Sequence, residues 1–290
     1  LAQTGQWSKC LTLLESLGVA PADLKALDLF RAKFPQNHQP PDLTEADVAA
    51  ARDLGLLRGE RVTLDREQFG DYLRRLPAHT APDALGHRAD YYRSYLFRSP
   101  KASGEGSAGI DILFQLCDKI AAGAPPEKVK DALFLSTGTA LLKPKTKAKP
   151  EGDIRPVCVT GILRKLASGA LLSQYKEQIV QRFEESHQYG ASKDGNVKVF
   201  HAIKTLLEAD PTLAVVSLDA RNAFNCVSRF AVLKGLRAIC PQLIPFFLDI
   251  YGRSNKVRFS RSDLEGIFHT NVLNREGVQQ GCTFGSILFC

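Results

Sequence analysis

The chain has 290 residues, of which 44% are hydrophobic and 24% are charged. That composition is typical of a folded globular protein with one large domain or two ordinary ones. The formal net charge of +7 favours an anionic partner such as nucleic acid. No apolar run approaches the ~20 residues that span a membrane, and no signal peptide opens the chain. We therefore predict an intracellular protein without a membrane partner.

The seven cysteines are scattered singly along the chain, and no two of them form a C-x-x-C pair. Zinc sites and disulfide frameworks both need clustered or regularly spaced cysteines. The pattern predicts reduced thiols and no zinc. The cysteines are Cys10, Cys117, Cys158, Cys226, Cys240, Cys282 and Cys290.

Residues 1–96 have mostly helical patterning. Thr44 and Asp47 have the spacing of a capping box at the start of a helix. Residues 85–96 carry tyrosines and arginines at helical spacing. Such a stretch can contact nucleic acid, but a partly buried helix with arginine stems along its apolar face is the favoured interpretation.

The middle of the chain begins with small residues at 101–109, whose glycines have G-x-G-x-x-G spacing. No strand precedes them, so we do not interpret them as a dinucleotide site. Residues 143–150 form a loop with four lysines, which we interpret as a mobile finger over phosphates. Apolar periodicity predicts helices over residues 110–123, 161–183 and 194–207, and a short helix after Pro126.

The last third contains the most informative segments. An apolar run predicts a strand over residues 213–219, which ends at the carboxylate of Asp219. Helices are expected over residues 228–239 and 241–251. A hairpin is expected between residues 256–260 and 267–273, with the segment Arg261-Ser262-Asp263 at or near its turn. A carboxylate at a strand end can hold a metal against a phosphate chain, and a glycine-framed turn lets backbone approach a nucleotide closely.

Taken in order, these segments resemble the reverse transcriptases of non-LTR retrotransposons, and the resemblance spans most of the chain. Single motifs are weak, but five in register are specific. The segments are LLKP at residues 141–144, RPV at 155–157 with LRKL at 163–166, QYG at 188–190 with Gly195 and His201, SLDARNAFN at 217–225 with Arg229, and GVQQG at 277–281. TAPDALG at residues 80–86 and GQWSK at residues 5–9 resemble the lead-in of that family.

The resemblance implies an attack of a primer 3′-hydroxyl on the α-phosphate of a dNTP, run by two Mg²⁺ ions about 4 Å apart. Asp219 is the implied first metal ligand, and the backbone carbonyl of Ala220 is implied to face the second metal. By itself, an aspartate at a strand end is more often a structural cap or turn residue. Within the five motifs, the catalytic interpretation is favoured.

The resemblance also implies the residues that contact the dNTP. Phe224 is implied to lie beneath the sugar and to exclude a 2′-hydroxyl by steric clash, which is compatible with ordinary core packing. Arg155 is implied to clamp the phosphates, with either Lys143 or Lys149 as its companion. The other implied contacts are the backbone amides of Asn222 and Ala223, and the residues Gln280 and Gly281.

The chain departs from the family in two places. Cys282, Thr283 and Phe284 stand where Asp-Pro-Leu usually follows the glutamines. The second carboxylate pair, carried by a Tyr-x-Asp-Asp hairpin, is absent, and so is methionine. We therefore expect a fragment of a longer reading frame that lacks polymerase activity by itself.

The expected fold is α+β. Residues 1–96 form a mostly helical N-terminal extension, residues 97–210 polymerase fingers, and residues 211–290 an incomplete palm. The expected partners are an RNA template, a DNA primer and dNTPs, in the nucleus. Two alternatives stay open. One is a nucleic-acid-binding remnant of a decayed or domesticated retroelement, and the other is a maturase of the group II intron type.

Overall fold

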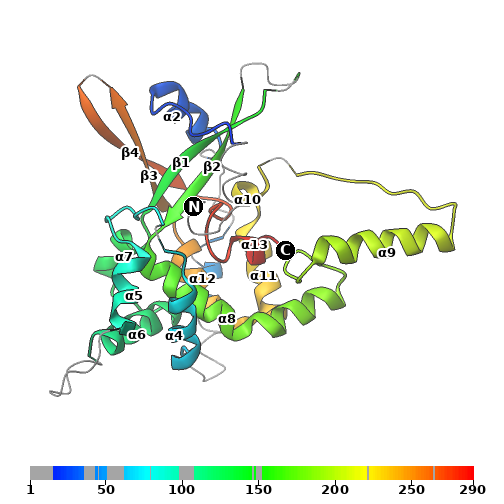
Figure 1. The fold of residues 1–290 in the computed structure, drawn as a ribbon, viewed down its shortest axis with the longest axis horizontal. Helices are drawn as coiled ribbons and strands as arrows, with labels where there is room; N and C mark the ends of the chain where they lie inside the picture. The colour runs from blue at the N-terminus through cyan, green and yellow to red at the C-terminus, as the bar shows by residue number, and fades with distance from the viewer. Residues whose placement is uncertain are drawn as a thin grey trace.

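The computed structural model describes residues 16–35, 43–44, 46–50, 62–78, 80–97, 108–145, 147, 152–220, 222–263 and 265–290. Within these ranges the protein combines many helices with one four-stranded sheet (Figure 1). The expectation of a mixed α and β protein is confirmed at this level. Residues 101–107 of the predicted linker at 101–109 and the candidate Lys149 lie outside the described residues, and the last two linker residues begin helix α6 (Ala108–Ala121).

The sheet has the strand order β2-β1-β3-β4, so β2 lies at one edge. The β1–β2 and β3–β4 pairs are antiparallel, and β1 pairs with β3 in parallel. The predicted C-terminal hairpin is confirmed, with longer strands, and its turn directly follows Asp263, the last residue of the segment predicted to lie at or near the turn. The strands are β1 (Ser136–Lys143), β2 (Asp153–Thr160), β3 (Asn255–Asp263) and β4 (Gly266–Asn274).

Helix α2 (Leu24–Arg31) covers one face of this sheet. Its Phe30 ring lies over Gly138 of β1, where a methyl group would be 2.3 Å from the ring edge. The same ring packs against Phe259 of β3, with ring centroids 5.0 Å apart. Along β1, buried residues alternate with half-exposed ones, so the opposite face is the more open one.

A helical layer forms the second and larger core. Its centre is the long helix α8 (Ile162–Glu185), which contacts helices from both halves of the chain (Figure 1). The helices predicted in the middle and last thirds of the chain are confirmed, with ends shifted by a few residues. The elements around α8 are α4 (Arg66–Arg75), α5 (Ala89–Phe97), α6 (Ala108–Ala121), α7 (Glu127–Leu133), α11 (Arg229–Ile239), η3 (Pro241–Leu243), α12 (Ile244–Tyr251) and α13 (Gly285–Phe289).

The described part of residues 1–96 contains the helices α2, α4 and α5 together with non-helical segments. The Thr44 hydroxyl accepts from the Asp47 amide, and the Asp47 carboxylate accepts from the Thr44 amide, which is the predicted capping box. Helix α5 starts at Ala89, later than predicted, because the Asp83 carboxylate holds the preceding residues in a turn. The Arg93 guanidinium donates to the Leu76 carbonyl, which supports the packed interpretation of this helix.

The predicted strand at residues 213–219 is wrong. Helix α9 (Gly195–Ala209) is followed by a segment at residues 210–220 that returns to the body as an exposed, extended chain (Figure 1). We call this segment the arm. Val216 is 78% exposed and Leu218 is 90% exposed. Branched apolar residues favour extended backbone, but a strand also needs a neighbour for its hydrogen bonds, and no described strand pairs with the arm.

Candidate functional site

The glycine-framed turn at residues 277–282 packs closely against two other segments. Gly277 and Gly281 have positive φ values of 66° and 103°, which glycine adopts readily. A methyl group at Gly277 would lie 2.2 Å from the carbonyl carbon of Asn225. One at Gly281 would lie 2.4 Å from the carbonyl oxygen of Cys158. Both glycines are therefore required by backbone conformation and by space.

Backbone hydrogen bonds fix the turn at the edge of the sheet. The Cys158 amide of edge strand β2 donates to the Gln280 carbonyl at 2.7 Å. The Val278 amide donates to the Phe224 carbonyl, also at 2.7 Å. Phe224 belongs to the short helix α10 (Ala223–Cys226). Three segments that carry predicted site residues, namely β2, α10 and the turn, are thus joined through their backbones.

Two buried arginines support the turn from the helical layer. Arg164 of α8 donates to the Gln279 side-chain oxygen at 2.9 Å and to the Tyr251 hydroxyl at 3.1 Å. Arg229 of α11 donates to the carbonyls of Gly277, Tyr251, Arg253 and Asn274 at 2.9–3.1 Å. Each carbonyl would otherwise be a buried acceptor in need of a partner. The sequence analysis included these arginines in motifs but assigned them no role.

Gln279, the first of the two glutamines, points into the protein and is fully buried. Its side-chain oxygen accepts from the Ser136 hydroxyl at 2.9 Å as well as from Arg164. Its backbone amide donates to the Tyr251 hydroxyl at 3.2 Å. Gln280 is half-buried and Gly281 is exposed, so the predicted contact residues lie on the accessible side of the turn.

Phe224 is half-buried and packs against Phe289, with ring centroids 5.2 Å apart. The preceding Asn222 has left-handed backbone with φ of 55°. Its side-chain amide donates to the Lys33 carbonyl at 2.8 Å, which ties α10 to the chain after α2. Ala223 is the first residue of α10 and is half-buried. Phe224 therefore has the packing role that the sequence left open, and part of its ring remains accessible.

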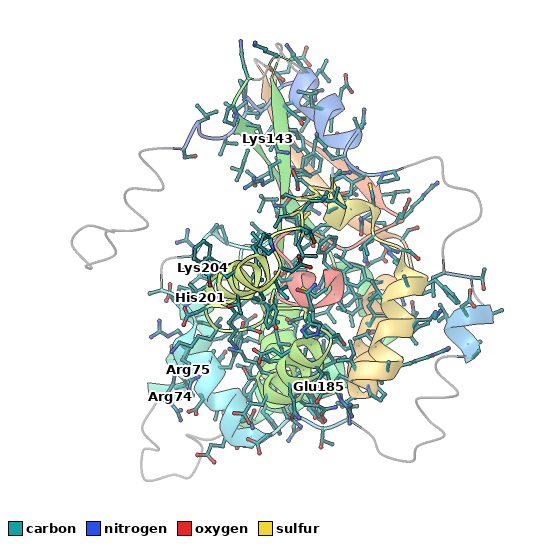
Figure 2. All side chains as sticks on the ribbon, turned by 90° about the vertical axis from the view of Figure 1, so that its right-hand side faces the viewer. Arg74, Arg75, Lys143, Glu185, His201 and Lys204 are labelled. Atoms are coloured by element: carbon teal, nitrogen blue, oxygen red, sulfur yellow. The ribbon has the colours of Figure 1, made fainter. Side chains whose placement is uncertain are left out.

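Arg155 is exposed on β2, directly opposite Leu141 of β1 in the strand register. Its guanidinium makes no hydrogen bond or ion pair with the described residues, so it is available to a ligand. Lys143 is half-exposed at the end of β1, opposite Asp153. Asp153 is paired with Lys33 at 2.5 Å. Figure 2 shows Lys143 at the upper end of the molecule, away from α9.

Asp219 and Ala220 lie on the exposed arm, outside the hydrogen-bonded group formed by the turn, β2 and α10. Across the described ranges, no group of three or more His, Cys, Asp or Glu side chains could hold a metal ion. A pair of Mg²⁺ ions needs several carboxylate oxygens that converge.

The TAPDALG segment supports the site from a distance. One Asp83 carboxylate oxygen accepts from the Ile162 amide at the start of α8 at 2.9 Å. The other accepts from the amides of Leu85 and His87, both at 2.9 Å. Gly161 precedes the helix and offers no side-chain cap, so Asp83 supplies both the acceptor and the negative charge that a helix start favours. The sequence analysis assigned this residue no role.

Burial determines the protonation of the groups beneath the turn. It raises the pKa of the Cys158 thiol to about 12 and raises that of the Tyr251 hydroxyl. Both groups are therefore neutral at physiological pH. The Arg164 guanidinium is the charged group at the centre of this cluster, and the Tyr251 ring lies beneath it, 5.5 Å from ring centroid to guanidinium carbon.

The described helices include none that is long and apolar enough to cross a membrane. Neither a scan against protein-family models nor a search of curated proteins found a match to this sequence. A functional assignment for this chain depends on its own residues and their geometry.

Proposed function

We propose that this chain is the nucleotide- and template-binding part of an RNA-directed DNA polymerase of the non-LTR retrotransposon type. One observation carries the proposal. The glycine turn bonds through Gln280 to the edge of β2 and through Val278 to Phe224 of α10. Three of the segments that resemble a polymerase nucleotide site, namely β2, α10 and the turn, are distant in sequence, yet they meet at one place in the fold. Chance similarity between short motifs does not require such a meeting.

In this proposal the incoming dNTP lies between the β1–β2 hairpin and the glycine turn. Arg155 has an unoccupied guanidinium fork suited to phosphate oxygens, and Lys143 adds a second positive charge. The accessible part of the Phe224 ring faces the sugar, and the backbone around Asn222 and Ala223 faces the triphosphate. Gln280 and Gly281 contact the sugar and the template base. Each of these roles concerns binding and orientation.

Catalysis is not assigned to this chain alone. Asp219 and the Ala220 carbonyl are proposed as ligands for Mg²⁺, but further carboxylates are needed to hold two ions. The arm that carries Asp219 has no strand partner among the described residues. We expect the 290-residue chain to bind nucleotide and nucleic acid without extending a primer. We also propose that the protein is located in the nucleus, because a nicked-DNA primer would be found there.

The surface charge supports a nucleic-acid template. Exposed basic side chains occur on more than one element, among them Lys204 on α9 and Arg74 and Arg75 on α4 (Figure 2). The Arg75 side chain is 80% exposed and that of Lys204 is 59% exposed. Exposed cations next to a phosphate backbone release counterions, so binding should weaken steeply with salt.

The test measures two affinities of the same protein. One is for an RNA–DNA primer–template, and the other is for the complementary dNTP once the hybrid is bound. Arg155→Ala should weaken dNTP binding about ten-fold and change hybrid affinity less than about two-fold. Arg182→Ala is the matched control, because this exposed arginine of α8 is paired with Glu185, away from the turn. Equal effects of the two variants on dNTP binding would reject the nucleotide site.

A nucleic-acid-binding remnant is the second candidate, and the isolation of Asp219 on the arm favours it. A remnant binds the hybrid with steep salt dependence but does not discriminate the complementary dNTP from the other three. Salt-independent hybrid binding would contradict both candidates, since each needs the exposed cations.

A further inference from the structure

The guanidinium of Arg164 is buried, and it contacts a side-chain amide, a phenol hydroxyl and a cysteine sulfur. The side chain is 1% exposed near the start of α8. Its hydrogen bonds reach the Gln279 amide oxygen at 2.9 Å, the Tyr251 hydroxyl at 3.1 Å and the Cys282 sulfur at 3.2 Å. None of the described carboxylates forms an ion pair with it. Burial of a charge without a carboxylate partner is costly, so a role beyond stability should account for this residue.

The contacts of Arg164 lie at the two ends of the part of the turn proposed to contact nucleotide. Gln279 immediately precedes Gln280, and Cys282 immediately follows Gly281. One planar guanidinium therefore holds both flanking residues. The Tyr251 hydroxyl adds a second link, because it accepts from Arg164 and from the Gln279 amide. With its ends held, the two central residues can remain accessible and still keep one conformation.

Arg164 also connects the turn to the hairpin that carries Arg155. It lies four residues after Thr160, the last residue of β2, and α8 begins between them. The Cys158 amide of the same strand bonds to the Gln280 carbonyl. The turn is thus held at two points, by the backbone of β2 at Cys158 and by the side chain of Arg164 in the helix that follows β2.

We propose that Arg164 is the positioning residue of this site, which sets the conformation of Gln280 and Gly281 and thereby the affinity for nucleotide. The effect on nucleotide affinity rests on the proposed function. The effect of Arg164 on the conformation of the turn does not depend on it. A lysine keeps the charge but lacks the planar fork, so it cannot hold Gln279, Tyr251 and Cys282 together. Arg164→Lys therefore separates the geometry of the group from its charge.

The experiment uses the full 290-residue chain and three variants. They are Arg164→Lys, Tyr251→Phe and the control Arg93→Lys. Arg93 is half-buried, and its guanidinium donates to the carbonyl of Leu76, the residue that follows helix α4. Amide hydrogen exchange is followed in peptides that cover residues 277–285. Affinities are measured for primer–template and for complementary dNTP.

We expect Arg164→Lys to speed exchange at the Val278 and Cys282 amides about ten-fold, and Tyr251→Phe about three-fold. The affinity for dNTP should fall by similar factors, while hybrid affinity changes less than about two-fold. Arg93→Lys should leave both the turn and nucleotide binding unchanged. If Arg164→Lys does not fold, Tyr251→Phe decides, because it removes one hydroxyl and keeps the ring.

Two results would overturn the inference. One is exchange in residues 277–285 that matches the control. The other is exchange that rises equally in all helices, which indicates general destabilisation. If the wild-type protein binds no dNTP, the proposed function fails, while the exchange data still decide whether Arg164 orders the turn.

Discussion

The Cys158 amide on edge strand β2 donates a 2.7 Å hydrogen bond to the Gln280 carbonyl in the glycine turn. An edge strand normally leaves such amides open to solvent or to other chains. Here the turn occupies part of that edge and brings the second glutamine beside the strand that carries Arg155. This one bond places the two parts of the candidate site next to each other.

Gly281→Ala should destabilise the protein. The added methyl would lie 2.4 Å from the Cys158 carbonyl oxygen, and the φ of 103° disfavours any side chain. We expect the free energy of unfolding, measured with urea, to fall by about 2–4 kcal/mol. Gly235→Ala is the control, because Gly235 lies in helix α11 with no atom within 4 Å of the added methyl. It should raise stability by about 0.5–1 kcal/mol. Similar losses at both positions would contradict the close approach.

Gly169→Ala should disrupt the packing of α4 on α8. A methyl there would lie 1.8 Å from the ring carbon Cζ of Tyr72. We expect a loss of about 3 kcal/mol, because the ring must leave its position. The double variant with Tyr72→Ala removes the clash, so its loss should be smaller than the sum of the single losses. Additive losses in urea unfolding would show that the ring and the glycine do not meet.

Cys282→Asp should stabilise the protein at neutral pH. The new carboxylate would accept from Arg164, whose Nη2 is 3.2 Å from the present sulfur. We expect a gain of about 1–3 kcal/mol, because a buried charge acquires a counter-charge. The guanidinium should depress the folded-state pKa of the aspartate below its unfolded value. The gain is then complete above the unfolded pKa and is lost as the pH falls through the folded one.

Cys240→Asp is the control for this substitution. Cys240 is fully buried within the apolar core cluster. A carboxylate there should destabilise the protein at neutral pH, since burial disfavours its charged form. Equal losses for the two variants would argue against a compensating role of Arg164.

Thiol reactivity should differ sharply between Cys226 and Cys158. Cys226 is exposed, whereas Cys158 is buried with its pKa raised to about 12. A raised pKa lowers the fraction of reactive thiolate at pH 8, and burial blocks access to the sulfur. N-ethylmaleimide should therefore modify Cys226 first, and Cys158 only after unfolding. Peptide mass spectrometry over time measures both rates, and equal native rates would show that β2 is open at Cys158.

Asp83 and Asp219 should respond differently to removal of their carboxylates. Asp83→Ala removes the acceptor at the start of α8 and should cost about 1–2 kcal/mol in urea unfolding. Asp219→Ala changes an exposed residue of the arm and should alter stability by less than about 0.5 kcal/mol. A large loss at Asp219 would mean that the arm packs against the body of the protein.

Sequence patterns that extend over a few residues predicted the helices and the hairpin, because these elements form between residues that are close in sequence. The periodicity of residues 161–183 predicted α8, and the reciprocal Thr44 and Asp47 bonds match their spacing. The hairpin of β3 and β4 was predicted because its strands are adjacent in sequence. The predicted strand at residues 213–219 was wrong, because strand formation depends on a partner that local sequence does not specify.

The sequence by itself determined the helices, the C-terminal hairpin and the glycines that a close turn requires, because backbone propensity and side-chain periodicity act over a few residues. The tertiary structure alone decided which glutamine faces inward, that Arg164 and Arg229 hold the turn, and that Asp83 caps a helix distant in sequence. These features arise from contacts between segments far apart in the chain. Burial makes such contacts necessary, since a polar group removed from water needs a partner wherever the fold supplies one.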